Sequence, residues 1–494
     1  MKIKQLLPAL VIMLPLLSRA QQNVAFDSYF KNQTLRIDYY HTGNADKEFI
    51  SLDLMYLQGA WAGNPDHCIQ PFELGLYGVK VYDLATNRLT FSTDYNTIFG
   101  EYQTTGEAKD GKIRTYHESV LIPYPKNPCL FVIEKRDKNN LLIPIYQLKI
   151  DPKDYHLVSE STQRAGDMII PVKQNGDPHH KVDLVIIGEG YAQADKDKFM
   201  KDLEYYSGVF FSIEPYKSHS RDFNITGIYS ASNESGVDEP RQGVYKNTVL
   251  NGSFNIFDTD RYLLIEDNHA IRNIAAQVPY DLIMIMVNRN RYGGGGIYKW
   301  QSVFAAGAPL GDYVFLHEFG HAFAGLADEY YTSDVAYEDF YPSGVEPLEP
   351  NITSLLDPGN LKWKDLVTPG LGIPTEWNKE VYDSLSKAYS IIIRKKNEKM
   401  KELSVSGASS EVIKEMEDSY DAKIFALRSE INNFIFNHPL KDKIGAFEGA
   451  GYKSEGLYRP TVNSLMLRFD ENNISYGKVN ERAIIKMIEY YTKK

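Results

Sequence analysis

Two histidines and one glutamate in this chain have the spacing of a metal-dependent hydrolase. In the segment HEFGHAFAGLADEY, which begins at His317, the second histidine, His321, follows four residues later. On an α-helix these two positions lie on one face, one turn apart, so both imidazoles can bind the same ion. Glu318 would lie beside that ion and take a proton from a zinc-bound water, whose pKa falls to about 7 on the metal. The spacing therefore predicts a zinc site with His317 and His321 as ligands and Glu318 as general base.

The residues around this motif indicate the helix that must carry it. The segment YVFLHEFGHAFA is apolar and contains no proline, so we expect a buried helix that opens near Asp312. Gly325 is a natural stop, because glycine tolerates the left-handed conformation that ends helices. The chain could then turn and bring the sequence LADEY back toward the metal.

A zinc site needs a third protein ligand, and Asp328 is the preferred candidate. It follows Gly325 by three residues, which is the glycine-to-ligand step of metzincin sites. Glycine lies one residue later than in the usual metzincin pattern, because Ala324 occupies its place. The alternatives therefore stay open, and they are the carboxylates Glu329, Glu338, Glu346 and Glu349.

A second element, GLYRPTVNSLML at residues 456–467, is similar to the tight turn that metzincins place beneath the metal. Met466 would be the methionine of this Met-turn, although methionine more often fills a gap in a core. Residues 478–491 then predict a closing helix with one apolar stripe.

Together with LRIDYYHTGN at residues 35–44, these motifs resemble peptidase family sixty-four of the metallopeptidases, named for a bacterial immunoglobulin A peptidase. The resemblance extends over nearly the whole mature chain. It implies zinc, Glu318 as general base, and His317, His321 and Asp328 as ligands. It also implies a metzincin-like zinc helix with a Met-turn, and an N-terminal β-sandwich. The substrate is not implied by the resemblance.

The chain of 494 residues is long enough for two or three domains. Short alternating runs such as LRIDYYH and GVKVYDL predict an antiparallel sandwich at 21–155, and 156–181 is expected to be a linker with a short strand inside. At 182–494 we expect the catalytic domain, with VDLVIIGEGY, ITGIYS and YDLIMIMVN as strands. Two helices within about 377–437 would be an insertion. The predicted fold is a multidomain protein, with an N-terminal all-β sandwich and an α/β metzincin-like zinc peptidase domain that carries a helical insertion.

Several other features are open to two interpretations. The glycine run Gly293–Gly296 could be an edge strand that pairs with an extended substrate, or a loose loop. The candidates to steady the substrate carbonyl or oxyanion are Tyr330, Tyr458 and Arg459, for each of which packing is the alternative. Cys68 and Cys129 could form a disulfide or remain buried thiols.

The beginning of the chain and its charge bear on location and partners. Residues 1–20 have the zones of a secretory signal peptide: Lys2 and Lys4, the apolar LLPALVIMLPLL, and a small-x-small site ending at Ala20. We expect a mature protein that is secreted or periplasmic, with no stable membrane insertion, because no later apolar stretch is long enough. The net charge of -11 argues against nucleic acid as a partner.

Two hypotheses of function follow from the sequence. The first is a secreted zinc-dependent endopeptidase that acts on a protein or peptide substrate, with a host glycoprotein among the candidates. The second is a non-catalytic extracellular binding or adhesion protein on a metallopeptidase scaffold. The intact HExxH motif favours the first hypothesis.

Overall fold

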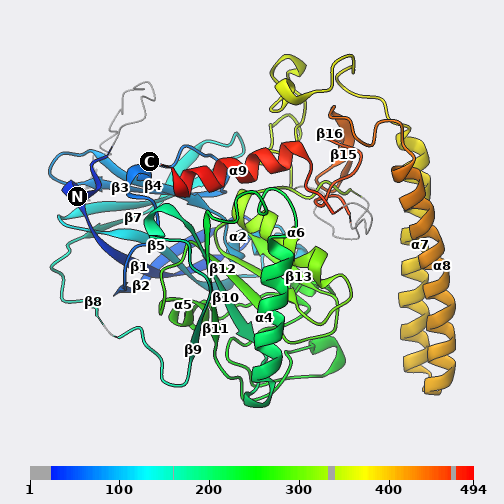
Figure 1. The fold of residues 1–494 in the computed structure, drawn as a ribbon, viewed down its shortest axis with the longest axis horizontal. Helices are drawn as coiled ribbons and strands as arrows, with labels where there is room; N and C mark the ends of the chain where they lie inside the picture. Colours follow the sequence, from blue (N-terminus) through cyan, green and yellow to red (C-terminus); the bar gives the residue numbers. More distant parts are fainter. Residues whose placement is uncertain (1–23, 160, 332–339, 469–473, 494) are drawn as a thin grey trace, which may run out of the picture.

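A computed structural model of the chain describes residues 24–159, 161–331, 340–468 and 474–493. Within these residues the chain is a multidomain α/β protein with several sheets (Figure 1). The expected signal peptide at residues 1–20 lies outside the described residues, and so does Glu338.

The N-terminal part, which we call the N-terminal sandwich, contains two four-stranded sheets. Across the first sheet the order is β5 (Arg114–Pro125), β1 (Phe30–Gly43), β2 (Glu48–Leu57) and β8 (Leu157–Val158). Across the second it is β4 (Leu89–Tyr95), β3 (Tyr77–Asp83), β6 (Cys129–Arg136) and β7 (Leu142–Ile150). Three short helices accompany them: α1 (Phe26–Tyr29), α2 (Ile98–Gln103) and α3 (Gly106–Lys109).

Alternation of residues along the strands explains why these two sheets pack face to face. Leu35, Ile37 and Tyr39 of β1 are every second residue, and all three are buried in the same core as Val79 of β3 and Ile133 of β6. Successive side chains of a strand point to opposite faces, so one face of each sheet contributes to this core.

The C-terminal domain, from β9 onward, is built on a mixed six-stranded sheet. Its order is β13 (Gly294–Ile297), β14 (Gln301–Ala305), β12 (Leu282–Val287), β10 (Val182–Glu189), β11 (Phe223–Tyr229) and β9 (Met168–Lys173). The four central strands are parallel, and the edge strands β13 and β9 are antiparallel to their neighbours. β9 lies in the segment that the sequence suggests as a linker, and it pairs with β11 of this domain.

Both faces of this sheet are covered, which accounts for the continuous apolar strands. Leu184 and Ile186 of β10 face a core that includes α4 (Lys196–Phe210), α6 (Gly311–Ala324) and α9 (Lys478–Thr492). Val185 and Ile187 face the opposite core, which contains α5 (Asn268–Ala275) and continues into the N-terminal sandwich. Parallel strands buried on both faces are expected to lack polar alternation.

The remaining elements follow α6 along the chain. α7 (Lys379–Val405) and α8 (Ser410–Phe436) lie where the sequence predicts two helices, and they form a hairpin that projects from the body of the molecule (Figure 1). After them come the hairpin strands β15 (Phe447–Ala450) and β16 (Lys453–Arg459). α9 returns to the N-terminal sandwich, where the Asn64 amide donates to the Tyr491 carbonyl over 3.1 Å.

Two further points concern the whole described chain. Cys68 and Cys129 are both free and buried, so the disulfide alternative is wrong in this structure. Each helix of the described residues is too short or too polar to cross a lipid bilayer.

The glycine run forms the edge strand β13 rather than a loose loop, and α6 explains why glycine is needed there. A Cβ atom added to Gly296 would lie 2.4 Å from the carbonyl oxygen of Glu318, in the backbone of α6. On the other face of the strand, a Cβ at Gly295 would lie 2.6 Å from the ring of Tyr262. Helix and strand therefore approach each other more closely than any side chain would permit.

We expect Gly296→Ala to destabilise the protein by about 1–3 kcal/mol, because the new methyl group meets backbone that cannot move aside. The matched control is Gly208→Ala on α4, where an added Cβ meets nothing within 4 Å. That substitution should leave stability unchanged or raise it by up to about 1 kcal/mol, since alanine favours the helix. Urea denaturation of both variants measures the difference, and equal stability of the two would contradict this account of the glycines.

Candidate active site

α6 carries both histidines of the HExxH motif, and main-chain carbonyls orient their rings. The Nδ1–H of His317 donates to the carbonyl of Leu465 over 3.1 Å, and that of His321 donates to the carbonyl of Leu326 over 2.5 Å. With the proton held on Nδ1, each Nε2 presents a lone pair, which is the form that binds a metal. The two Nε2 atoms lie 3.1 Å apart.

The helix ends where the sequence suggests, and the chain then turns back to the histidines. Gly325 has φ 58° and ψ 36°, the left-handed conformation, and its N–H donates to the carbonyl of His321. Three residues later, Oδ1 of Asp328 lies 3.0 Å from Nε2 of His317 and 3.3 Å from Nε2 of His321. The structure thus brings together His317, His321 and Asp328.

These three atoms fit a tetrahedral zinc ion. Zinc with ligands at about 2.0–2.1 Å separates its ligand atoms by about 3.3–3.4 Å, close to the three distances observed here. Oδ1 of Asp328 is buried and receives no hydrogen bond from the described residues. Burying three lone pairs that face one another is unfavourable, and a cation bound between them would offset this cost.

The Asp328 carboxylate and the His321 imidazole of the site shift each other's pKa values. Burial alone would raise the pKa of Asp328, but the two imidazoles hold it well below its ordinary value. Burial lowers the pKa of His321, yet the Asp328 carboxylate outweighs this effect and raises it to about 9. A proton therefore competes with a metal for His321, so metal affinity should fall as the pH falls.

The other described carboxylates considered as third ligand have hydrogen-bond or ion-pair partners of their own, although Glu349 lines the same cavity as the histidines. Glu329 is buried, and it accepts hydrogen bonds from Ser464, Asn351 and Asn480. Glu346 lies 3.1 Å from Lys362 Nζ. Glu349 accepts from the hydroxyl of Tyr341 over 3.1 Å. Among these described carboxylates, Asp328 is the one grouped with both histidines.

Met466, the residue expected in a Met-turn, packs against α6. Its side chain is fully buried, and its sulfur is 3.1 Å from the position of a Cβ added to Gly320, the residue before His321. The carbonyl of Met466 accepts from the N–H of Glu329 over 2.9 Å, and Leu465 before it supports His317. The turn is therefore hydrogen-bonded to His317 and to Glu329, the neighbour of Asp328.

A cavity of about 160 Å³ opens beside the three candidate ligands and Glu318. The N-terminal sandwich contributes Leu74, Asn96 and Glu101 to its wall, so both domains form the cavity. Burial raises the pKa of Glu101 to about 7, against the opposing influence of His321. Glu101 could not be predicted from the sequence, because nothing in the local pattern of α2 indicates contact with a site more than two hundred residues away.

Burial also raises the pKa of Glu318, while the neighbouring imidazoles act in the opposite direction. A carboxyl whose pKa moves toward neutrality can both accept and return a proton under physiological conditions.

Of the three residues considered for the substrate carbonyl, one lines the cavity. Tyr330 does so, and its hydroxyl accepts from Arg261 Nη2 over 3.3 Å. Arg459 is completely buried elsewhere, with its guanidinium 4.4 Å from the ring centroid of Trp377. Tyr458 lies beside Glu448. Arg459 and Tyr458 therefore have the packing role, and Tyr330 remains the candidate.

Comparison with protein families agrees with this architecture. Residues 170–488 match the family model described as IgA Peptidase M64, and residues 25–147 match the one described as Peptidase M64 N-terminus. The chain belongs to the IgA peptidase M64 family. The M64 assignment supports a peptidase, and it implies a protein or peptide substrate. No curated protein matches the chain.

The M64 match includes α6, Asp328, the turn at Met466 and most of α9. Its N-terminal companion covers most of the sandwich, including Glu101. The candidate site thus combines residues from both matched regions.

The hydrogen bonds of Glu329 generate a testable prediction. Glu329→Leu leaves three buried polar partners without their acceptor, so we expect a loss in the free energy of unfolding on the order of 3 kcal/mol, with lower metal content. Glu329→Gln retains a polar head of the same size and should lose less than half as much. Chemical denaturation and elemental analysis measure both effects. An equal loss in the two variants would mean that packing, rather than these hydrogen bonds, stabilises the turn.

Proposed function

We propose that this M64 protein is a secreted zinc-dependent endopeptidase with a metzincin-like catalytic domain. The observation that carries the proposal is the group formed by His317, His321 and Asp328, whose ligand atoms all lie within 4.8 Å of one another. Imidazole and carboxylate ligands in this number are typical of catalytic zinc sites, which keep one position open. When bound there, zinc would supply Lewis acidity that acidifies water and polarises a peptide carbonyl.

Glu318 is proposed as the general base. It follows His317 on α6 and lines the same cavity as the three ligands, so it can reach a water molecule held there. Its raised pKa lets it accept the proton of the attacking water and then donate it to the leaving amine.

Tyr330 and Arg261 are proposed to stabilise the negative charge that develops on the carbonyl oxygen. Both line the cavity, and the guanidinium lies 5.9 Å from the centre of the tyrosine ring. A cation next to the phenol favours donation of the hydroxyl proton toward an oxyanion.

The glycine strand β13 is proposed to bind the substrate backbone. Gly294, Gly295 and Gly296 line the cavity at the edge of the sheet, where an extended peptide can lie close to the main chain. The main chain of Gly294 already exchanges hydrogen bonds with Arg261 and Leu263, so a substrate would pair with β13 beyond that residue. A host glycoprotein and a broad range of nutrient proteins are both consistent with such a surface.

The role of Glu318 can be tested by Glu318→Gln. Loss of the base should lower kcat/KM for casein or gelatin by about 10²–10⁴-fold. Zinc content should stay the same, because Glu318 is not a ligand in the proposal. Glu204→Gln, an exposed glutamate on α4, is the control and should retain full activity.

Two results would contradict this proposal. One is wild-type activity in Glu318→Gln. The other is stoichiometric zinc in a wild-type protein that cleaves no protein or peptide offered to it, which would favour an extracellular binding protein on the same scaffold.

The proposal of export has its own test. The positive residues, apolar core and small-x-small site of the N-terminus lead us to expect cleavage after Ala20. Intact mass measurement of the protein from its native cells should therefore show a chain that begins at Gln21. A mass that includes residues 1–20 would contradict removal of the signal peptide.

A further inference from the structure

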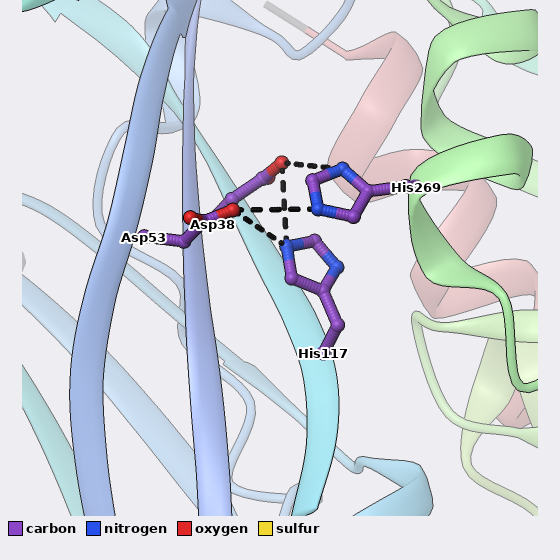
Figure 2. Close-up of side chains that lie close together, drawn as sticks. All are labelled: Asp38, Asp53, His117 and His269. Atoms are coloured by element: carbon purple, nitrogen blue, oxygen red, sulfur yellow. Dashed lines mark ion pairs between the residues drawn. The ribbon is translucent and has the colours of Figure 1, made fainter.

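A second group of potential metal ligands lies far from α6, where the N-terminal sandwich meets the C-terminal domain. Figure 2 shows Asp38, Asp53, His117 and His269 pointing toward one another. Nε2 of His117 lies 3.4 Å from Oδ2 of Asp53 and 3.6 Å from Oδ2 of Asp38. Nε2 of His269 lies 3.3 Å from Asp53 Oδ2, whereas its Nδ1 lies 3.7 Å from Asp38 Oδ2. The rings of His117 and His269 stack, with their centroids 3.6 Å apart.

The four side chains come from both domains. Asp38 is on β1, Asp53 on β2 and His117 on β5, which are neighbouring strands of the first sheet of the sandwich. His269 is on α5, which packs against β5 from the C-terminal domain. The first three lie in the region matched by the M64 N-terminus, and the fourth lies in the M64 peptidase region.

Two of these side chains are buried with polar atoms that are not hydrogen-bonded. The Asp38 side chain is 0% exposed and that of His117 is 9% exposed. Among the described residues, Nε2 of His117 has no hydrogen-bond partner, and Oδ2 of Asp38 has an ion pair with Arg36 Nη2 at 2.9 Å but no aligned hydrogen bond; both atoms face the centre of the group. Buried polar atoms of this kind are rare and call for a ligand or an ion.

Neighbouring residues hold the buried pair in this orientation. The Ser119 hydroxyl donates to Oδ1 of Asp38 over 2.6 Å, which leaves Oδ2 directed at the group. The Asn268 amide lies 3.0 Å from Nδ1 of His117 and so directs Nε2 inward. Such contacts to the outer atoms of ligands are typical of metal sites.

The charge of the group leaves room for a cation. Arg36 Nη2 lies 2.9 Å from Oδ2 of Asp38 and balances one carboxylate. The second carboxylate, Asp53, is partly exposed, and the described ion pairs near it are those with the two histidines. With both histidines neutral, Asp38, Asp53 and Arg36 together carry a net charge of about -1. A bound divalent ion would change this net charge to about +1.

We propose that Asp38, Asp53, His117 and His269 bind a second divalent transition-metal ion, for which zinc is the best match. Two imidazoles and two carboxylates suit zinc, whereas calcium and magnesium prefer oxygen ligands alone. The separations that involve one nitrogen of each ring are 3.4 and 3.6 Å from His117 Nε2 and 3.3 Å from His269 Nε2, close to the roughly 3.3–3.4 Å between ligands of a tetrahedral zinc ion.

Four protein ligands form a closed site, so this ion would be structural. It would join the N-terminal sandwich to the C-terminal domain. Because the sandwich contributes Glu101 to the cavity beside α6, the second ion would also support the wall of that cavity.

Binding requires local rearrangement, because the rings of His117 and His269 are stacked and must turn so that one nitrogen of each points at the ion. Nε2 of His117 must offer a lone pair, so its proton must be on Nδ1 and the amide oxygen of Asn268 must face the ring. A 180° turn of the amide exchanges its oxygen and nitrogen without moving the backbone. The Ser119 hydroxyl, which accepts from the amide nitrogen, and Arg272 Nε, which donates to the amide oxygen, must adjust with it. The alternative is a metal-free cluster in which imidazole protons face the carboxylates.

Zinc content of the full-length chain tests the proposal. To isolate the second site, the combined variant His317→Ala/His321→Ala removes ligands of the first. We expect about two equivalents of zinc in the wild type and about one in this variant, measured by elemental analysis after removal of loosely bound metal. Adding His269→Ala, whose side chain is 37% exposed, should remove the remaining equivalent with little effect on folding.

The matched control is His156→Ala in the same background. His156 lies 2.8 Å from Asp154 on the surface of the sandwich, as an isolated histidine–aspartate pair. This variant should retain the equivalent that His269→Ala loses. In the His317→Ala/His321→Ala variant, zinc but not calcium should also raise the melting temperature. Adding His269→Ala should abolish that rise, while the circular dichroism spectrum should remain that of a folded chain.

Either of two results would overturn the proposal. The first is less than about a tenth of an equivalent of zinc in the folded His317→Ala/His321→Ala variant. The second is retention of that one equivalent of zinc after His269→Ala is added to the His317→Ala/His321→Ala variant. Because the background variant lacks the first site, neither result depends on whether the protein is a peptidase.

Discussion

Two main-chain carbonyls determine what the histidines of α6 can do. The carbonyls of Leu326 and Leu465 accept from the Nδ1 atoms, so both Nε2 lone pairs are directed toward Asp328. Leu326 follows the glycine that ends the helix, and Leu465 belongs to the turn that precedes α9 in the chain. The ligand geometry therefore depends on two chain segments that are far apart in sequence. Hydrogen bonds of Glu329 link these same segments, because its carboxylate accepts from Ser464 and its N–H donates to Met466.

The N-terminal sandwich is part of the same structure rather than an appendage. Its core continues into the face of the C-terminal sheet that α5 covers. Through that contact Glu101 reaches the cavity, and Asp38, Asp53 and His117 reach His269. A large apolar interface fixes the relative position of two domains better than polar contacts alone. Such a fixed interface is what allows residues of two domains to share one cavity or one ion.

Sequence alone predicted the features that depend on local spacing. His317 and His321 are one helical turn apart, the apolar strands are buried on both faces, and Gly325 ends the helix, so each could be inferred from neighbouring residues. Features that depend on tertiary contact were not predictable in this way. Asp38, Asp53, His117 and His269 are separated by long intervals and show no motif spacing. For Gly293–Gly296, strand and loop remained equally possible, because the close approach of α6 that requires glycine is a long-range contact.

The shifted glycine shows how a departure in spacing can be accommodated. The helix extends through Ala324, and Gly325 takes the left-handed position one residue later than in the usual metzincin pattern. This places the carbonyl of Leu326 against Nδ1 of His321, a contact that itself fixes the ring. Asp328 keeps the step of three residues from the glycine, so the proposed ligand shifts together with the turn. Since the glycine determines where the chain reverses, the distance from the glycine to the ligand constrains the site more than the distance from the second histidine does.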